Sequence, residues 1–354
     1  MFSLRAKVAS GIFLLISLVP TLATAHHSTA GFFNPARKVE VEGVITAVQW
    51  RNPHTVFELD VPNAEGELVQ WHVESGALGI LRAQGLTSDI LKVGDRVKIL
   101  GDESRRGRPE MFARNILLPS GKEVMLTLGA SVYFPTQNSV ELLAGGYNET
   151  ETAAARAEAD GIFRVWSRIG ETGRRLHTPT FSNGDIDTLP LTAKGREIRE
   201  QWDGSAEFIL GCTDWNMPRL MGNPLPMQFV QVGEDIVIRF EEGDNQRTVH
   251  MDPNAAPTPV GPSLMGFSVG HWERNTLVIQ TTQLQESTYS LPVSRQAELL
   301  ERFTPSPDGS RLDYEIVFTD QPMLTSPVTQ RSAWFWRPEI QVNSYACEVE
   351  QEIN

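Results

Sequence analysis

The chain has 354 residues, of which 40% are hydrophobic and 21% are charged, and 44 acidic residues stand against 31 basic ones. This is the composition of a globular protein, and at about 100–200 residues per domain its length favours two domains. The net charge of −13 argues against nucleic-acid binding, which needs a basic surface, and against attraction to an anionic membrane.

Residues 1–25 have the pattern of a secretory signal peptide. A positively charged start and a short apolar run, residues 8–18, precede the small-residue cleavage site Ala23-Thr24-Ala25. The run is too short to cross a bilayer, which needs about 20 apolar residues, and no later run is longer. We therefore expect a periplasmic or secreted protein with no membrane span, cleaved after Ala25 so that His26 becomes the amino terminus.

The mature chain has two cysteines, Cys212 and Cys347. An oxidising compartment favours a disulfide between them, which would tie the start of the second domain to its last strand. The alternative is a pair of separate buried thiols.

Residues 26–125 are predicted to form a small OB-like β-barrel domain. Short segments that alternate apolar and polar residues predict strands, and residues 77–84 predict one helix, which ends at Gly85. Five short strands with one helix are typical of a closed barrel of the OB type. The predicted strands are 38–50, 55–61, 67–73, 96–100 and 111–118.

Residues 126–160 are predicted to be a linker with a solvated helix at 151–160, and residues 161–354 an antiparallel β-barrel domain. One helix is expected at 192–202, with Thr192 as its N-cap. Sequential strands joined by short turns form a meander, and such a sheet usually closes to remove its edges. The expected fold is therefore mainly β, a small OB-like barrel followed by a larger, lipocalin-like meander barrel. The predicted strands of the second domain are 161–168, 227–232, 235–241, 246–251, 268–273, 276–282, 298–303 and 311–319.

Several motifs resemble those of a family of exported bacterial domains of unknown function. In the first half they are His26-His27-Ser28, Trp50-x-Asn52-Pro53-His54, Trp71-x-x-Glu74 and Lys92-x-Gly94-Asp95. The second half resembles the β-rich region that usually follows that domain, through Gly161-Ile162-Phe163, Arg247-x-x-His250-Met251-Asp252, Gly266-x-Ser268-Val269-Gly270-x-Trp272-Glu273 and Glu301-Arg302-Phe303. The resemblance implies export and this two-part architecture, and it brings no activity with it.

Four histidines near the mature start are candidate metal ligands. After cleavage, the α-amine and the imidazole of His26 can chelate one ion, and a second imidazole completes a three-nitrogen set that suits copper. His54 is the best third ligand and His27 the next, while His72 shares one face of a strand with Glu74. The alternative is that these histidines only satisfy backbone groups or belong to a frayed terminus.

The second domain offers a candidate acid–base site. His250 and Asp252 alternate onto one face of a predicted strand, as do His271 and Glu273 on another. A carboxylate beside a histidine fixes its tautomer and raises its basicity, so His250, Asp252 and Glu273 are the predicted catalytic residues.

Aromatic residues of the same domain predict an apolar ligand pocket inside the barrel. The side chains expected to line it are Trp166, Trp272, Phe267 and Phe303. The alternative is that these aromatic side chains simply fill the core.

These observations leave three functions open. The first is a periplasmic or secreted binding protein with an amino-terminal copper site and an apolar small molecule in the second barrel. The second is a lyase, isomerase or hydrolase that acts on an apolar small molecule there, and the third is a structural or partner-docking protein. Zincin, P-loop and dinucleotide-binding motifs do not occur in the sequence.

Overall fold

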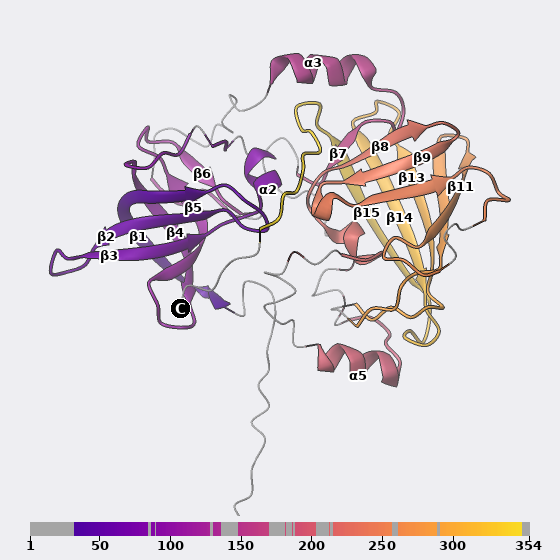
Figure 1. Ribbon diagram of the computed structural model, residues 1–354, viewed down its shortest axis with the longest axis horizontal. Coiled ribbons are helices and arrows are strands. Elements are labelled where there is room, and N and C mark those ends of the chain that lie inside the picture. The colour runs from indigo at the N-terminus through magenta and orange to yellow at the C-terminus, as the bar shows by residue number, and fades with distance from the viewer. Residues whose placement is uncertain are drawn as a thin grey trace, which may run out of the picture.

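The protein is mainly β and forms two separate β structures, which we call the small barrel (β1–β6) and the large barrel (β7–β15) (Figure 1). No helix within the ranges given below is long and apolar enough to cross a membrane. The computed structural model describes residues 32–83, 86–88, 90–127, 130–135, 148–169, 181, 186, 188–202, 212, 215–256, 261–288 and 291–348.

The small barrel is a ring of five strands in the order β1-β2-β3-β5-β4-β1. The β3–β5 pairing is parallel and the other pairings in the ring are antiparallel, and α2 (Leu78–Ala83) lies between β3 and β4 in the chain. This order is that of an OB-type barrel, so the prediction for this part of the chain is confirmed. The strands are β1 (Phe33–Gln49), β2 (Val56–Pro62), β3 (Leu68–Glu74), β4 (Arg96–Ser104), β5 (Glu110–Leu117) and β6 (Glu123–Met125), which extends β5 at its free edge.

The long strand β1 closes the ring because it pairs with β4 up to Val44 and with β2 from Val44 onwards. A Cβ atom at Gly43 would lie 2.6 Å from the Asp60 carbonyl oxygen. Only glycine therefore allows the backbones of β1 and β2 to approach this closely where β1 passes from one partner to the other.

The large barrel is closed by nine strands in the order β10-β11-β12-β13-β14-β15-β7-β8-β9. The predicted closed meander is confirmed with one difference, since β10 and β11 pair in parallel and all other neighbours are antiparallel. The strands are β7 (Val165–Ser167), β8 (Met227–Val232), β9 (Asp235–Phe240), β10 (Gln246–His250), β11 (Phe267–Glu273), β12 (Thr276–Thr282), β13 (Glu298–Pro305), β14 (Arg311–Thr319) and β15 (Val328–Trp336).

The strand β15 is not among those that the sequence predicts, although it joins β14 to β7 and so closes the barrel. Its burial alternates only at the start, and Ser332, Ala333 and Trp334 are then buried in succession. Because both faces are covered there, the alternation that identifies a half-buried strand is lost.

Two longer helices lie outside the barrels and agree with the predictions. α3 (Glu149–Glu158) has no buried residue, and its N-cap Asn148 accepts hydrogen bonds from the backbone of Thr150 and Glu151. α5 (Ala193–Gln201) begins after the predicted N-cap Thr192, whose hydroxyl accepts a hydrogen bond from Gly195 N. The 3-10 helices are η1 (Arg219–Gly222) and η2 (Glu242–Asp244).

A buried ion pair lies among the apolar side chains inside the large barrel. Arg247 binds Glu301, and the two side chains are 1% and 0% exposed. The Tyr314 hydroxyl donates to the second Glu301 oxygen at 2.8 Å, and Arg247 Nε donates to Ser268 Oγ at 2.9 Å. Burial beside the Glu301 carboxylate raises the pKa of Tyr314 well above its usual value, so its proton stays available for this hydrogen bond.

After β15 the chain returns to the small barrel as a strap, which we define as residues 337–348. Figure 1 shows this yellow segment beside α2, between the two barrels. Ile340 of the strap belongs to a small apolar cluster with Ala83 of α2 and Val165 and Ile169 of the large barrel. The two barrels thus share a hydrophobic contact in addition to their separate cores.

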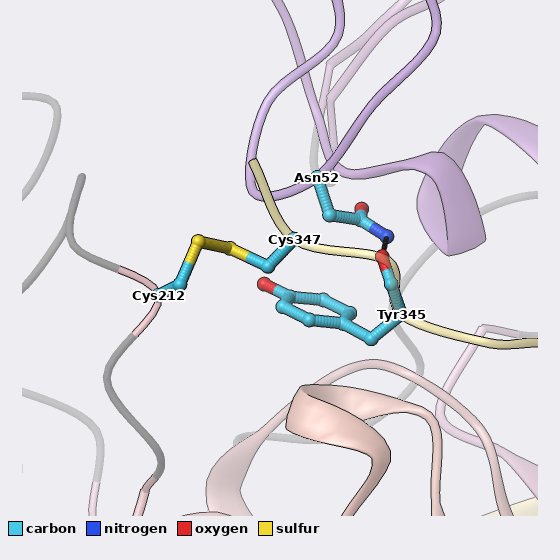
Figure 2. The surroundings of a disulfide bond; sticks show 4 residues. All are labelled: Asn52, Cys212, Tyr345 and Cys347. Carbon is cyan, nitrogen blue, oxygen red and sulfur yellow. Dashed lines mark hydrogen bonds between the residues drawn. A yellow bond between two sulfur atoms is a disulfide. The ribbon is translucent and has the colours of Figure 1, made fainter. Parts of the chain in front are cut away.

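The strap is held covalently by the predicted disulfide between Cys212 and Cys347, which the structure confirms (Figure 2). Cys347 also pairs with Asn52 of the small barrel in an isolated β-bridge. The disulfide therefore fixes the end of the strap where it crosses to the first half of the chain.

We expect Glu301→Gln to lower the free energy of unfolding by about 3–5 kcal/mol, because it leaves the Arg247 charge buried without its counter-ion. Urea denaturation followed by tryptophan fluorescence measures the change. The control is Glu315→Gln, which removes the exposed pair with Arg331 and should cost less than about 1 kcal/mol. Equal effects of the two substitutions would contradict a structural role for the buried pair.

We expect reduction of Cys212–Cys347, or the double change of both cysteines to serine, to lower the free energy of unfolding. The bond closes a loop with a sequence separation of 135, and the chain-entropy model assigns such a loop roughly 4–5 kcal/mol. Thermal unfolding with and without reductant measures the loss. If the reductant lowers the midpoint of the double serine variant as well, the effect does not come from this bond.

Candidate functional site

The predicted metal ligands His26 and His27 lie outside the described residues, whereas His54 and His72 lie on the small barrel. His54 follows Pro53, just before β2, and its side chain is 18% exposed. Its Nδ1 lies 3.1 Å from Glu74 Oε2, and its ring packs edge-on against Phe112 of β5 with 5.5 Å between the centroids.

The contact with Glu74 determines which nitrogen of His54 remains free for a ligand. A carboxylate accepts hydrogen bonds, so a neutral His54 carries its proton on Nδ1 and its lone pair on Nε2. Metal-binding histidines usually have this arrangement, in which a carboxylate orients the ring and increases the basicity of the ligating nitrogen.

His72 forms a second, separate pair with a carboxylate. Its Nδ1 lies 2.8 Å from Glu58 Oε1, and β3 places His72 and Glu74 on one face, as the sequence predicts. The two histidines nevertheless have different partners and do not meet around one point. Within the described ranges, no group of three or more His, Cys, Asp or Glu side chains is arranged to hold a metal ion.

The structure does not bring the predicted catalytic residues together. His250 Nδ1 lies 2.8 Å from Asp235 Oδ2, and its ring stacks on Phe267. Asp252 is exposed and accepts a hydrogen bond from Asn254 N in a local turn. The partner of His250 is therefore Asp235 of the adjacent strand β9, because β10 ends at His250 and the chain turns away before Asp252.

Glu273 lies apart from this pair, at the exposed end of β11. It binds Arg302 of β13, and His271 Nε2 lies 3.4 Å from its other oxygen. These two contacts lower the pKa of Glu273, the bond from Arg302 more than that from His271. The group is an anion that belongs to a surface ion pair.

The four aromatic residues expected to line a ligand pocket do not surround one cavity. Trp166 and Phe303 are fully buried in the core, where Phe303 packs against Phe229 at 5.3 Å. Trp272 is 42% exposed, and Phe267 lies on the opposite face of β11 from the buried Ser268. The aromatic side chains of the described core pack on one another, so Trp166 and Phe303 belong to the hydrophobic core of the large barrel.

Ser268 has the spacing of a hydrolase nucleophile, since it is the central residue of Gly266-x-Ser268-x-Gly270. It lies within β11, is 1% exposed, and is hydrogen-bonded to Arg247 and Thr281. A nucleophile elbow requires an exposed serine at a turn between a strand and a helix, so this serine has a structural role.

A cleft of about 250 Å³ lies between the two barrels, and the sequence analysis did not predict it. Its walls come from three separate parts of the chain, namely the small barrel, the large barrel and the strap. Residues that line it include His54, Phe112, Thr127, Trp215, Tyr345 and Cys347. The sequence signal that could have indicated this cleft is the motif Asn52-Pro53-His54, since Pro53 and His54 both line it.

Among the carboxylic acids at this interface, Glu241 has the pKa that is shifted most. It follows β9, is fully buried, and accepts a hydrogen bond from Asn343 N of the strap at 3.0 Å. Arg82 of α2 approaches to 4.0 Å, which is too long for a hydrogen bond, and Asp244 adds a repulsion. Burial, together with the smaller repulsion from Asp244, outweighs the contacts with Asn343 and Arg82 and raises the pKa of Glu241 to about 7.

Comparison with known proteins supports part of the family assignment. Residues 14–112 match the model of a family of unknown function (DUF6152), which agrees with the resemblance of the first half of the chain. No curated protein matches the chain. The resemblance of the second half stays a prediction.

We expect the protein to lose stability as pH rises from about 5 to 8, because folded Glu241 keeps its proton up to about pH 7, whereas the unfolded chain releases it near its ordinary value of 4.5. The stabilisation is present in acid and is lost as pH rises through the folded pKa, with a size on the order of 3 kcal/mol. The side chain of Glu241→Gln cannot ionise. The free energy of unfolding of this variant should therefore fall less between pH 5 and pH 8 than that of the wild type. Urea denaturation at the two pH values tests this, with the exposed Glu298→Gln as a control that should follow the wild type.

Proposed function

We propose that this protein is an exported binding protein whose ligand is a copper ion, held by the processed amino terminus and by His54. The β-barrel fold and the match to an uncharacterised family are compatible with a binding protein. The observation that carries the proposal is the Glu74–His54 contact, which leaves Nε2 of His54 as the free ligand atom.

The signal-peptide pattern supplies the other two ligands. Cleavage after Ala25 would free the α-amine of His26 beside its own imidazole, so one residue would offer two nitrogen atoms to the same ion. With His54 the set has three nitrogens, and among divalent first-row metals such a set binds copper most strongly.

The position of Phe33 supports the contact between the terminus and His54. The Phe33 ring lies 5.9 Å from Phe112, and Phe112 in turn lies 5.5 Å from His54. His26 precedes Phe32 by six positions, and six extended residues span at most about 20 Å. The length of chain between His26 and Phe32 is therefore compatible with the proposed bond from the α-amine of His26 to the copper ion at His54.

We expect protein that begins at His26 to bind Cu(II) at least tenfold more tightly than a copy that retains Ala23-Thr24-Ala25, because the added residues remove the α-amine from the chelate. His54→Ala should weaken binding by a similar factor, and affinity should fall in acid, since imidazole must be deprotonated to ligate. Competition titration against a chelator measures affinity, and electron paramagnetic resonance counts the nitrogen ligands.

His271→Ala is the matched control for this experiment, because His271 is exposed on the large barrel and should leave Cu(II) affinity unchanged. The proposal is wrong if the two amino-terminal forms bind Cu(II) equally, or if His54→Ala behaves like His271→Ala.

A further inference from the structure

Glu241 lies where three parts of the chain meet, namely the large barrel, α2 and the strap. It follows β9 and its side chain is fully buried. Gly79 of α2 packs so closely against it that a Cβ atom there would lie 2.3 Å from Glu241 Oε1. From the strap, Asn343 N donates to Oε2 at 3.0 Å. One carboxyl group of the large barrel therefore contacts both elements that connect it to the small barrel.

The contacts of Glu241 are too few for a buried anion. Its Oε1 makes no hydrogen bond in the described structure, and Arg82 Nη1, 4.0 Å away, is likewise buried without one. Glu301, by contrast, binds Arg247 through one oxygen and Tyr314 through the other. A buried charge without a close counter-ion and hydrogen bonds is costly, so the closed interface suits the neutral acid better than the carboxylate.

The other titratable groups around Glu241 do not stabilise its charge. Asp244 of η2 repels it, and Arg82 is the one cation among the described groups that act on it. Burial and the nearby carboxylates of Glu242 and Glu241 raise the pKa of Tyr345 in the strap, so this phenol stays neutral. Loss of the Glu241 proton therefore places a poorly balanced charge between α2, the strap and the large barrel.

We propose that the contact of α2 and the strap with Glu241 is a pH-sensitive latch between the two barrels, which is closed while Glu241 is protonated and opens when it ionises. Opening brings the carboxylate into water while both barrels stay folded. Asn52 binds Leu78 N of α2 and the Tyr345 carbonyl, so these elements remain with the small barrel. The disulfide remains as a tether.

The latch also controls the width of the cleft between the barrels. Ile80 of α2 lines the cleft from one barrel, and Glu242 and Gly243, which directly follow Glu241, line it from the other. Separation of α2 from this segment therefore widens the cleft. The latch itself uses none of the residues proposed to bind copper.

The pH range of opening follows from the difference between the closed and the open protein. The pKa of Glu241 is about 7 in the closed protein, and exposure to water returns it to its ordinary value of 4.5. The closed form is therefore fully favoured below the ordinary value. Opening becomes easier as pH rises towards 7 and changes little above that.

The test is hydrogen exchange by mass spectrometry on the full chain and on Glu241→Gln, at pH 5 and pH 8. Dividing each wild-type rate by that of the variant at the same pH removes the pH dependence of the exchange chemistry. For peptides of α2 and of the strap around Asn343, we expect this ratio to rise about tenfold or more from pH 5 to pH 8. Peptides of β14 (Arg311–Thr319) should exchange far more slowly than these at both pH values.

Two further variants separate the latch from a merely structural role of Glu241. Arg82→Gln removes the cation that favours the Glu241 anion, so the rise should continue to a higher pH than in the wild type. The exposed Glu298→Gln should follow the wild type. The inference is overturned if the ratio is equal at the two pH values, if α2, the strap and β14 exchange at one common rate, or if Arg82→Gln leaves the pH range unchanged.

Discussion

The arrangement of the two barrels depends on the hydrogen bonds of one buried residue, Asn52. Its side-chain amide donates to the Tyr345 carbonyl at 2.5 Å, and its side-chain oxygen accepts from Leu78 N of α2 at 3.0 Å. Its backbone oxygen accepts from Glu348 N at 3.0 Å. A buried polar group without a hydrogen bond costs free energy, so the buried position of Asn52 requires the contacts with both the strap and α2.

The same contacts build the cleft. Asn52 holds Tyr345 and Cys347 through a hydrogen bond and a β-bridge (Figure 2), and His54, two residues further along the chain, also lines the cleft. The disulfide to Cys212 adds a covalent link from a third segment. Gly79 is equally constrained, because a Cβ atom there would lie 2.3 Å from Glu241 Oε1. The close packing of α2 on the large barrel leaves the open volume beside His54.

The two barrels differ in the side chains that they offer to a ligand. The large barrel is filled by its aromatic core and by the neutralised pair of Arg247 and Glu301, which favours a rigid scaffold. The small barrel holds two histidine–carboxylate pairs, His54 with Glu74 and His72 with Glu58.

The sequence by itself determined the mainly β class, the OB-like barrel of the first half and the closed barrel of the second, because alternation and turn residues are local signals. Its cysteine count favoured the pairing of Cys212 with Cys347 over two free thiols. It also identified His54 as a residue that could bind a ligand. Only the tertiary structure decided that His250 pairs with Asp235, that Trp166 and Phe303 fill the core, and that the open space lies between the barrels. Alternation tells which face of a strand is apolar, but it does not tell which distant strand, helix or strap covers that face.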